Sequence, residues 1–279
     1  MGPPITLTTD FGYDDAYVGA MKGAILSVNP EASIIDISHS IEPQNVLQAG
    51  FILSAAYRSF PRQTIHVAVV DPGVGSERRG VILKTSNALF VAPDNGILSY
   101  IVDDLSPLEG RPRMRGAGEL KEIVFKTGVE VVSITDPRFW RHPVSPTFHG
   151  RDVFGPVAAG LSLGISLYEF GEKVNSLHVL PLPKPSLDAE GVLVGQVLHI
   201  DRFGNLITNI RSCDLPGKEV VIEIAGYCIQ GISTYYAQKE GTMAIVGSSG
   251  YIEVSLRGGS ACDFLGAIAG DEVKVTSAA

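Results

Sequence analysis

Three short turns, each with an aspartate and a glycine, follow apolar, strand-like segments in the first third of the chain. They are centred on Asp10, Asp71 and Asp94, and the second has the sequence Asp71-Pro72-Gly73-Val74-Gly75. Ligand sites in open α/β sheets form beyond the carboxyl ends of strands, where such turns lie. Glycine lets the backbone approach a ligand closely, although Asp-Pro-Gly and Asp-Asn-Gly are also ordinary turn sequences. The Asp71 turn is therefore either a ligand site or a plain turn, and the Asp94 turn is predicted to be structural.

Two arginines and one histidine have the chemistry to complement the Asp71 carboxylate. Arg78 and Arg79 lie seven and eight residues beyond it, so a loop can bring a guanidinium back beside it or leave a solvated surface pair. His149, within residues 145–152 and just before a predicted helix, can hold or transfer a proton near neutral pH. The other histidines have no metal-ligand spacing and are predicted to be structural or exposed: His39, His66, His142, His178 and His199. No metal site is predicted.

Two further polar turns lie in the last third of the chain. One spans residues 201–205 with Asp201 and Asn205 at its ends, and the other spans residues 247–253 with Ser248 and Glu253. Together they offer carboxylate, amide and hydroxyl groups suited to a zwitterionic or nucleoside ligand. Each is also compatible with a simple β-turn.

The elements that position the first group of residues alternate between strands and helices. Strands are predicted at 5–9, 33–37, 64–70, 81–84, 89–92 and 130–134, and helices at 16–26, 45–58 and 154–163. Continuous apolar strands separated by helices predict βαβ units and a buried parallel sheet. Residues 1–180 are therefore predicted to form a Rossmann-like α/β domain with a mostly parallel sheet, with surface excursions around residues 103–146.

The pattern changes after a proline-rich segment. Residues 181–189 contain three prolines within five positions and are predicted to be a stiff, extended linker. Residues 190–279 contain short alternating segments bounded by Gly, Asn and Asp, which predict an all-β domain, either a barrel or a sandwich.

Composition excludes several classes of function. The chain has 279 residues, 45% hydrophobic and 19% charged, which argues against disorder. Its formal charge of −8, with no basic cluster, argues against nucleic-acid binding. Its three cysteines lack disulfide or zinc spacing and predict a reducing, cytoplasmic location. No apolar run reaches the ~18 residues of a membrane span, and no signal peptide is recognisable, so no membrane association is predicted.

Seven segments, in order along nearly the whole chain, carry a family resemblance. They are TTDFGYDDAYVGAMKG, DISHSI, VVDPGVGSERRG, APDNGILS, SPTFHGRDVFGPVAA, DRFGNLITNI and GSSGYIEV. Together they resemble the S-adenosyl-L-methionine hydrolases (hydroxide adenosyltransferases), of the superfamily that includes fluorinase and chlorinase. Each motif is weak alone, whereas seven in register are highly specific.

The resemblance implies a fold and a reaction. It implies an N-terminal α/β domain, a C-terminal β-barrel, and a homotrimer whose substrate lies between the first domain of one subunit and the barrel of the next. It implies that Asp71, Arg78 and His149 direct water onto the ribose 5′ carbon of S-adenosylmethionine or its sulfur epimer. The products would be adenosine and L-methionine, with no cofactor.

The resemblance also implies binding roles and leaves alternatives. Asp10 would hold the ribose hydroxyls, Tyr235 would stack on adenine, and Phe11 would lie at the substrate. The methionine end would contact Asp201, Asn205 and Ser248, and the adenine would lie near Glu253 and Leu256. A tyrosine replaces Asp71 in the halogenating relatives, so hydrolysis is favoured over the alternatives of a 5′-halogenase or a non-catalytic binding protein.

Overall fold

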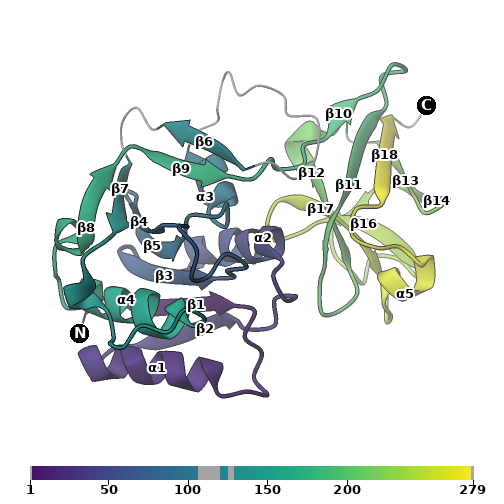
Figure 1. Cartoon of the computed structure of the whole chain (residues 1–279). Coiled ribbons are helices and arrows are strands. Elements are labelled where there is room, and N and C mark those ends of the chain that lie inside the picture. The colour runs from purple at the N-terminus through teal and green to yellow at the C-terminus, as the bar shows by residue number, and fades with distance from the viewer. Residues whose placement is uncertain (1, 106–119, 125–128, 218, 278–279) are drawn as a thin grey trace. The chain divides into compact units, whose positions relative to one another are not determined.

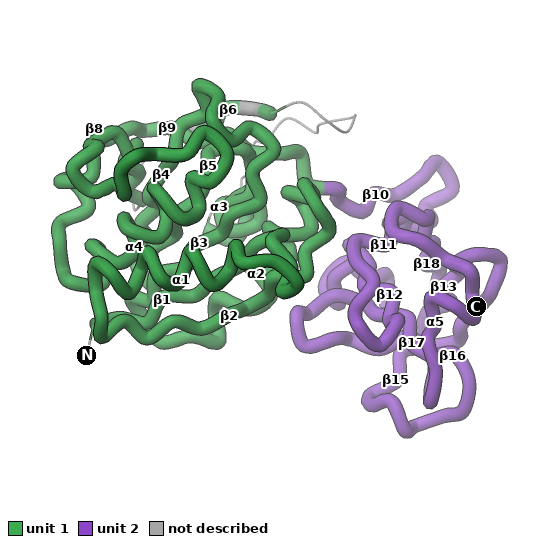
Figure 2. The backbone as a smooth tube through the Cα atoms, turned by 60° about the horizontal axis from the view of Figure 1, so that its bottom comes forward, with its two compact units in different colours: residues 1–182 green, residues 183–279 purple. Residues whose placement is uncertain are grey.

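The computed structural model describes residues 2–105, 120–124, 129–217 and 219–277. The chain divides into two compact units, Met1–Leu182 and Pro183–Ala279 (Figures 1 and 2). No helix among the described residues is long and apolar enough to cross a lipid bilayer. The part of the predicted excursion that covers residues 106–119 and 125–128 lies outside the described residues.

The first unit is built on a seven-stranded sheet with the order β2-β1-β3-β5-β4-β7-β8. The strands are β1 (Ile5–Thr9), β2 (Ile34–Ser38), β3 (Thr64–Val69), β4 (Gly80–Lys84), β5 (Ala88–Pro93), β7 (Glu130–Ile134) and β8 (Gly171–Val174). The pairs β1–β2, β1–β3 and β3–β5 are parallel. The pairs β4–β5, β4–β7 and β7–β8 are antiparallel, so β4 and β8 run against the other five strands. The predicted mostly parallel sheet is confirmed.

The inversion of β4 follows from the length of its connection. Only residues 85–87 separate β4 from β5, whereas a parallel connection needs a crossover of about a dozen residues. The two strands therefore form a hairpin. Because of this hairpin, the loop after β3 and the turn after β5 meet at one edge of the sheet, where Asp94 N donates to Arg79 O at 3.0 Å.

Helices cover both faces of this sheet (Figure 1). One face packs on α1 (Tyr17–Val28) and α4 (Gly155–Ser162), and the other on α2 (Val46–Ala56) and α3 (Ser99–Leu105). Alternate residues of a strand face opposite sides, so β1 is buried throughout. The Asn45 side chain caps α2 by accepting a hydrogen bond from Gln48 N at 3.0 Å. The remaining elements are a π-helix at Gly150–Phe154 and short 3₁₀ turns at Tyr57–Ser59, Pro137–Phe139 and Leu167–Phe170. A separate two-stranded antiparallel sheet pairs β6 (Lys121–Val124) with β9 (Ser176–Val179).

The second unit is a nine-stranded antiparallel sheet that curls into a barrel. The strand order is β14-β13-β18-β11-β12-β17-β16-β15, with β10 paired to β11, and only the short pair β15–β16 is parallel. Its elements are β10 (Ser186–Leu187), β11 (Leu193–Ile200), β12 (Leu206–Arg211), β13 (Val220–Ile224), β14 (Tyr227–Gln230), β15 (Ile232–Ser233), β16 (Thr242–Val246), β17 (Tyr251–Leu256) and β18 (Glu272–Ser277), with α5 (Ala261–Leu265) and a 3₁₀ turn at Ser212–Asp214. Apolar side chains from both ends of this strand order share one core, which distinguishes a barrel-like sheet from an open one.

Candidate active site

Asp71 and Arg78 are brought together by the loop between β3 and β4. Val74 N donates to Asp71 O at 3.1 Å, and Ser76 N donates to Gly73 O at 3.1 Å, so the chain turns back on itself twice. The Ser76 hydroxyl oxygen accepts from Arg78 N at 3.2 Å. The Arg78 guanidinium then donates to Asp71 Oδ2 in a close ion pair. Loop length alone left open whether Arg78 returned to Asp71, and the structure brings the two together.

This ion pair is shielded from solvent. The Asp71 side chain is 5% exposed and the Arg78 side chain 10%, and the guanidinium lies over the Phe154 ring at 5.3 Å. Burial raises the pKa of the Asp71 carboxyl above its ordinary value, and attraction to Arg78 opposes that rise without cancelling it. Burial also lowers the pKa of Arg78, which remains a cation at neutral pH.

His149 completes a group of three. Its Nδ1 lies 3.2 Å from Arg78 Nη2. Since a guanidinium has donors only, Nδ1 accepts this hydrogen bond and the neutral ring carries its proton on Nε2. Burial, and then repulsion from Arg78, lower the pKa of His149, so the ring is neutral near pH 7. The structure therefore holds a carboxylate, a guanidinium and a neutral imidazole in one connected cluster.

The segment before His149 is fixed by backbone packing and by a buried carboxylate. Asp152 is fully buried, and its Oδ2 accepts from Ser145 N at 2.9 Å. Gly75 has φ of +80°, and a Cβ there would overlap the Pro146 carbonyl oxygen. Only glycine allows the Asp71 loop to approach the His149 segment this closely.

Two buried atoms of the cluster lack partners. Asp71 Oδ1 and Arg78 Nε form no hydrogen bond with any other described residue. Buried polar atoms are normally satisfied by protein or by water, because an unsatisfied one costs about 1–3 kcal/mol. Asp71 Oδ1 and Arg78 Nε are therefore both available to hydrogen-bond a small polar group such as water.

Asp10 and Phe11 lie at the same edge of the sheet, directly after β1. Asp10 Oδ2 accepts from Gln44 N at 2.9 Å, which joins the β1 turn to the segment before α2. The Phe11 ring packs edge-on against Phe148 at 5.5 Å, next to His149. The first unit thus gathers all five of its predicted site residues at one edge.

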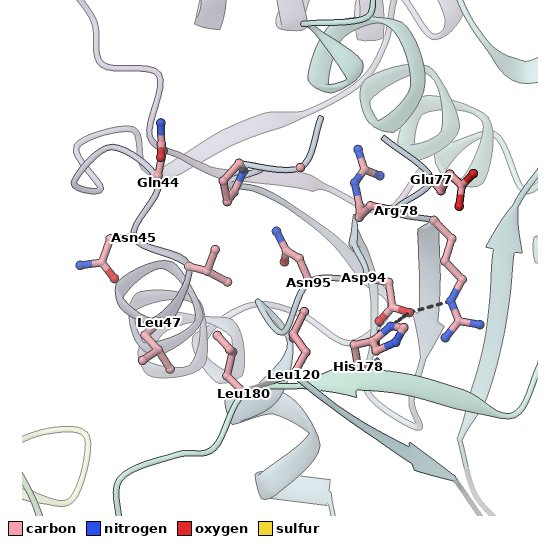
Figure 3. Close-up of a pocket in the computed structure, with 14 residues that line it drawn as sticks. Gln44, Asn45, Leu47, Glu77, Arg78, Asp94, Asn95, Leu120, His178 and Leu180 are labelled. Carbon is pink, nitrogen blue, oxygen red and sulfur yellow. Dashed lines mark hydrogen bonds and ion pairs between the residues drawn. The ribbon is translucent and has the colours of Figure 1, made fainter. Parts of the chain in front are cut away.

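A pocket of about 950 Å³ opens at this edge (Figure 3). Its lining comes from the start of α2, the loop containing Arg78, the turn after β5 and the end of β9: Gln44, Asn45, Val46, Leu47, Pro72, Gly73, Glu77, Arg78, Arg79, Asp94, Asn95, Leu120, His178 and Leu180. The charged side chains Glu77, Arg78 and Asp94 lie on one side of the pocket, and the uncharged side chains Gln44, Asn45 and Leu47 lie on the other (Figure 3).

The pocket reveals a cluster that sequence reasoning missed. Asp94 is buried and accepts from Arg79 Nε at 2.6 Å, from His178 N at 2.8 Å and from His178 Nδ1 at 2.8 Å. The structural role predicted for the Asp94 turn stays a prediction: Asp94 anchors Arg79 and also lines the pocket. His178 is half-exposed and paired with Asp94, although its sequence neighbourhood had no distinctive feature. The position of Asp94 after an apolar strand, like that of Asp71, was the available signal.

In the second unit, the structure joins two of the predicted residues. Asp201 Oδ1 accepts from the backbone amides of Phe203 and Asn205, each at 2.9 Å, and Oδ2 accepts from the Asn205 side-chain amide at 2.8 Å. Gly204, with φ of +81°, closes this turn. Asp201 and Asn205 therefore present a carboxylate and an amide in one fixed arrangement.

The other predicted residues of the second unit are not joined to that turn. Glu253 is buried and accepts from the Tyr236 hydroxyl at 3.1 Å, and burial raises its pKa. Leu256 forms an isolated bridge with Gly259. Tyr235 and Ser248 are exposed, and no hydrogen bond among the described residues links either one to Asp201. No group of three metal-ligating side chains occurs within the described parts of the chain.

Comparison with known proteins gives a consistent assignment. Residues 5–171 match the family model described as the SAM hydroxide adenosyltransferase N-terminal domain, and residues 195–274 match the model of its C-terminal domain. Together the two models cover most of both units.

Characterised relatives carry two different names. Proteins named (R)-S-adenosyl-L-methionine hydrolase are 34% identical in Methanocaldococcus jannaschii, over 90% of this chain and 87% of the relative, and 34% identical in Salinispora tropica, over 99% and 98%. A fluorinase from Actinoplanes sp. is 27% identical over 76% of this chain and 73% of its own. A solved structure of an uncharacterized conserved protein from Thermotoga maritima superposes with a TM-score of 0.82 at 32% identity, covering 97% of this chain and 99% of the other.

Proposed function

This chain belongs to the SAM hydroxide adenosyltransferase family, and we propose that it is an enzyme that hydrolyses S-adenosyl-L-methionine to adenosine and L-methionine. The observation that carries the proposal is the shielded cluster of Asp71, Arg78 and His149, with its unpartnered carboxylate oxygen. We further propose the (R)-sulfonium epimer as the preferred substrate, because that is the substrate in the names of the relatives that match nearly the whole chain.

The proposed chemistry is an in-line displacement at the ribose 5′ carbon. A sulfonium sulfur leaves without protonation, so the protein needs only to position and activate the attacking water. Asp71 Oδ1 would accept a hydrogen bond from this water, and the raised pKa of the Asp71 carboxyl makes it a better proton acceptor. Arg78 and the His149 Nε2 proton would stabilise hydroxide character on the attacking oxygen.

The proposed binding roles come from the family resemblance, and the positions of several side chains support them. Asp10, at the edge occupied by the cluster, would hold the ribose hydroxyls beside Phe11. The prearranged carboxylate and amide of Asp201 and Asn205 suit the zwitterionic methionine end, together with Ser248. Tyr235, Glu253 and Leu256 would surround adenine.

We propose that the protein is a homotrimer, in which the first unit of one subunit and the second unit of its neighbour bind one substrate molecule. This assembly would bring the ready-made carboxylate and amide of Asp201 and Asn205 to the cluster of Asp71, Arg78 and His149. A cytoplasmic location stays a prediction, for which the three free cysteines are the support.

The test is product analysis in ¹⁸O-water with molar chloride present, using each sulfur epimer separately. The expected products are adenosine labelled at the 5′ oxygen and L-methionine, formed faster from the (R) epimer. A chloride ion beside Asp71 would suffer like-charge repulsion on the order of 4 kcal/mol at ~4 Å, so no 5′-chloro-adenosine is expected. Halogenated product at a comparable rate, or ligand that binds and is recovered unchanged, would contradict the proposal.

A further inference from the structure

Strand β1 carries two buried threonines that are bonded to buried histidines in the same way. Thr6 Oγ1 lies 2.7 Å from His66 Nδ1, and Thr9 Oγ1 lies 2.7 Å from His39 Nδ1. All four residues have no exposed surface. The two pairs therefore lie on the same strand and have the same bonded groups, the same distance and the same burial. They differ in what lies beyond them, because Thr9 ends β1 and is followed directly by Asp10.

The Thr9 pair reaches the turn that contains Asp10. Thr9 Oγ1 accepts from Phe11 N at 3.2 Å, and His39 O accepts from Gly12 N at 2.8 Å. The two amides that follow Asp10 are thus both held by this pair. Asp10 itself adds a third tie, because its Oδ2 accepts from Gln44 N.

The direction of the Thr9–His39 bond follows from these contacts. The Asp36 carboxylate near Nε2 favours the tautomer with the proton on that nitrogen, so Nδ1 accepts from the Thr9 hydroxyl while the hydroxyl oxygen accepts from Phe11 N. His39 is consequently neutral, with its proton on Nε2. That atom lies 3.1 Å from Asp36 Oδ1, a contact short enough for attraction but too poorly aligned for a full hydrogen bond.

Asp36 is in turn fixed from the neighbouring helix. Its Oδ2 accepts from Lys22 Nζ of α1 at 2.7 Å, and the Tyr13 ring packs edge-on against His39 at 5.1 Å. Burial lowers the pKa of His39 while Asp36 opposes that change, which agrees with a neutral ring. The chain of contacts thus runs from α1 through β2 to the end of β1.

We propose that Thr9 and His39 are positioning residues, which hold the Asp10–Phe11–Gly12 turn in the conformation that receives the ribose. The inference rests on the proposed function, and neither side chain touches the substrate. A consequence for the cluster follows from packing, since Phe11 contacts Phe148 and leaves little room beside Gly150, where a Cβ would lie 3.0 Å from its ring. A displaced Phe11 would therefore disturb the residues on either side of His149.

The test compares Thr9→Val with Thr6→Val. Each replacement keeps the side-chain shape, removes one hydroxyl and leaves one buried histidine nitrogen without its partner. Both are expected to lower the midpoint of thermal unfolding. Only Thr9→Val is expected to raise KM, by about tenfold, with kcat changed less than about threefold, and to weaken adenosine binding by the same factor in calorimetry. Thr9→Ser, which restores the hydroxyl, is expected to return KM to within about twofold of wild type.

The outcomes separate this inference from the function on which it rests. Equal KM values for Thr9→Val and Thr6→Val, or a Thr9→Ser variant as impaired as Thr9→Val, would overturn the positioning role. Wild-type protein that forms no adenosine would overturn both proposals, and that result is known before any variant is made. If Thr9→Val does not fold, Thr9→Ala and Thr6→Ala provide the same comparison without a methyl group placed against the histidine.

Discussion

The two units prepare their predicted site residues in opposite ways. In the first unit, the charged groups are withdrawn from solvent and in contact with one another, as in the Asp71–Arg78 pair. In the second unit, partly exposed Asp201 is joined to buried Asn205 within one turn and has no cationic partner there among the described residues, while Tyr235 and Ser248 are exposed. Shielding strengthens electrostatic interactions and shifts pKa values, whereas an exposed turn can only recognise shape and hydrogen-bonding groups. The comparison supports the proposal that Asp71, Arg78 and His149 carry out the chemistry and that the Asp201–Asn205 turn serves recognition, although the second unit also buries one acidic side chain, Glu253.

Architecture explains this difference. At the carboxyl edge of the first sheet, the loop after β3 folds back under Phe154 and is closed by the backbone at Pro146. Charges placed there are covered by the same packing that forms the core. The turns of a small antiparallel barrel are hairpin ends, which point away from its core and cannot cover a charge in this way.

The largest effect should come from the shielded pair. Asp71→Asn keeps the shape of the side chain but removes its negative charge and most of its basicity. We expect kcat to fall by about 10²–10⁴-fold, the usual contribution of a general base, while substrate still binds. Single-turnover kinetics and calorimetry would measure the two quantities separately. A variant with wild-type turnover would show that Asp71 is not the base, and Asp201→Asn, which changes the same group in the second unit, is the matched control.

The next largest effect should be on stability in acid, where one buried group in each unit changes the free energy of unfolding in the opposite direction. Burial lowers the pKa of His66 in the first unit to about 4, against an ordinary value of 6.5. Between pH 4 and pH 6.5 the folded form therefore binds fewer protons than the unfolded form. The contribution of neutral His66 to the free energy of unfolding is complete above pH 6.5 and is lost as the pH falls toward 4. The difference of about 2.5 between the two pKa values corresponds to about 3 kcal/mol.

Glu253 in the second unit has the opposite sign. Its pKa is raised by burial. The contribution of protonated Glu253 to the free energy of unfolding is therefore present at low pH and is lost as the pH rises through the raised pKa. Urea unfolding of wild type, His66→Gln and Glu253→Gln near pH 7 and near pH 4.5 would measure both effects as differences in the free energy of unfolding. We expect His66→Gln to flatten the acid loss and Glu253→Gln to steepen it. Identical pH dependence in all three proteins would contradict the assignment of these shifts to burial.

Local sequence patterns were sufficient for the parts of the molecule that depend on neighbouring residues. Apolar patterns predicted β1, β2, β3 and β7, and they predicted a helix over residues 45–58 where α2 spans Val46–Ala56. The seven-residue separation of Asp71 and Arg78 correctly raised the prospect of an ion pair. In each case the interacting groups are close in the chain, so their spacing restricts the geometry.

Contacts between distant residues could not be predicted in this way. Asp94 and His178 lie 84 residues apart and meet only because β9 crosses the turn after β5. Thr9 and His39 lie 30 residues apart, in the motifs TTDFGYDDAYVGAMKG and DISHSI, and neither motif by itself indicates that the two side chains meet. Side-chain hydrogen bonds of this kind depend on the strand order, which periodicity does not determine. The supporting residues of a site are therefore less predictable than its central ones.

The smallest effect is expected from the turn of the second unit, and it tests whether two subunits share a site. In the Asn205→Ala, Ser248→Ala double variant, Asp201 Oδ1 still accepts from the backbone amides at 203 and 205, so the turn should persist. Losing an amide and a hydroxyl should raise KM about threefold to tenfold, with kcat little changed.

A mixing experiment then tests whether the first unit of one subunit works with the second unit of its neighbour. If it does, mixing this double variant with Asp71→Asn and allowing subunits to exchange creates some sites with both parts intact. Activity below KM should then exceed the sum for the two unmixed proteins. A mixture that only averages its components would argue against a shared site, and so would a fully active monomer in light scattering. In either case the second unit would have to serve its own chain.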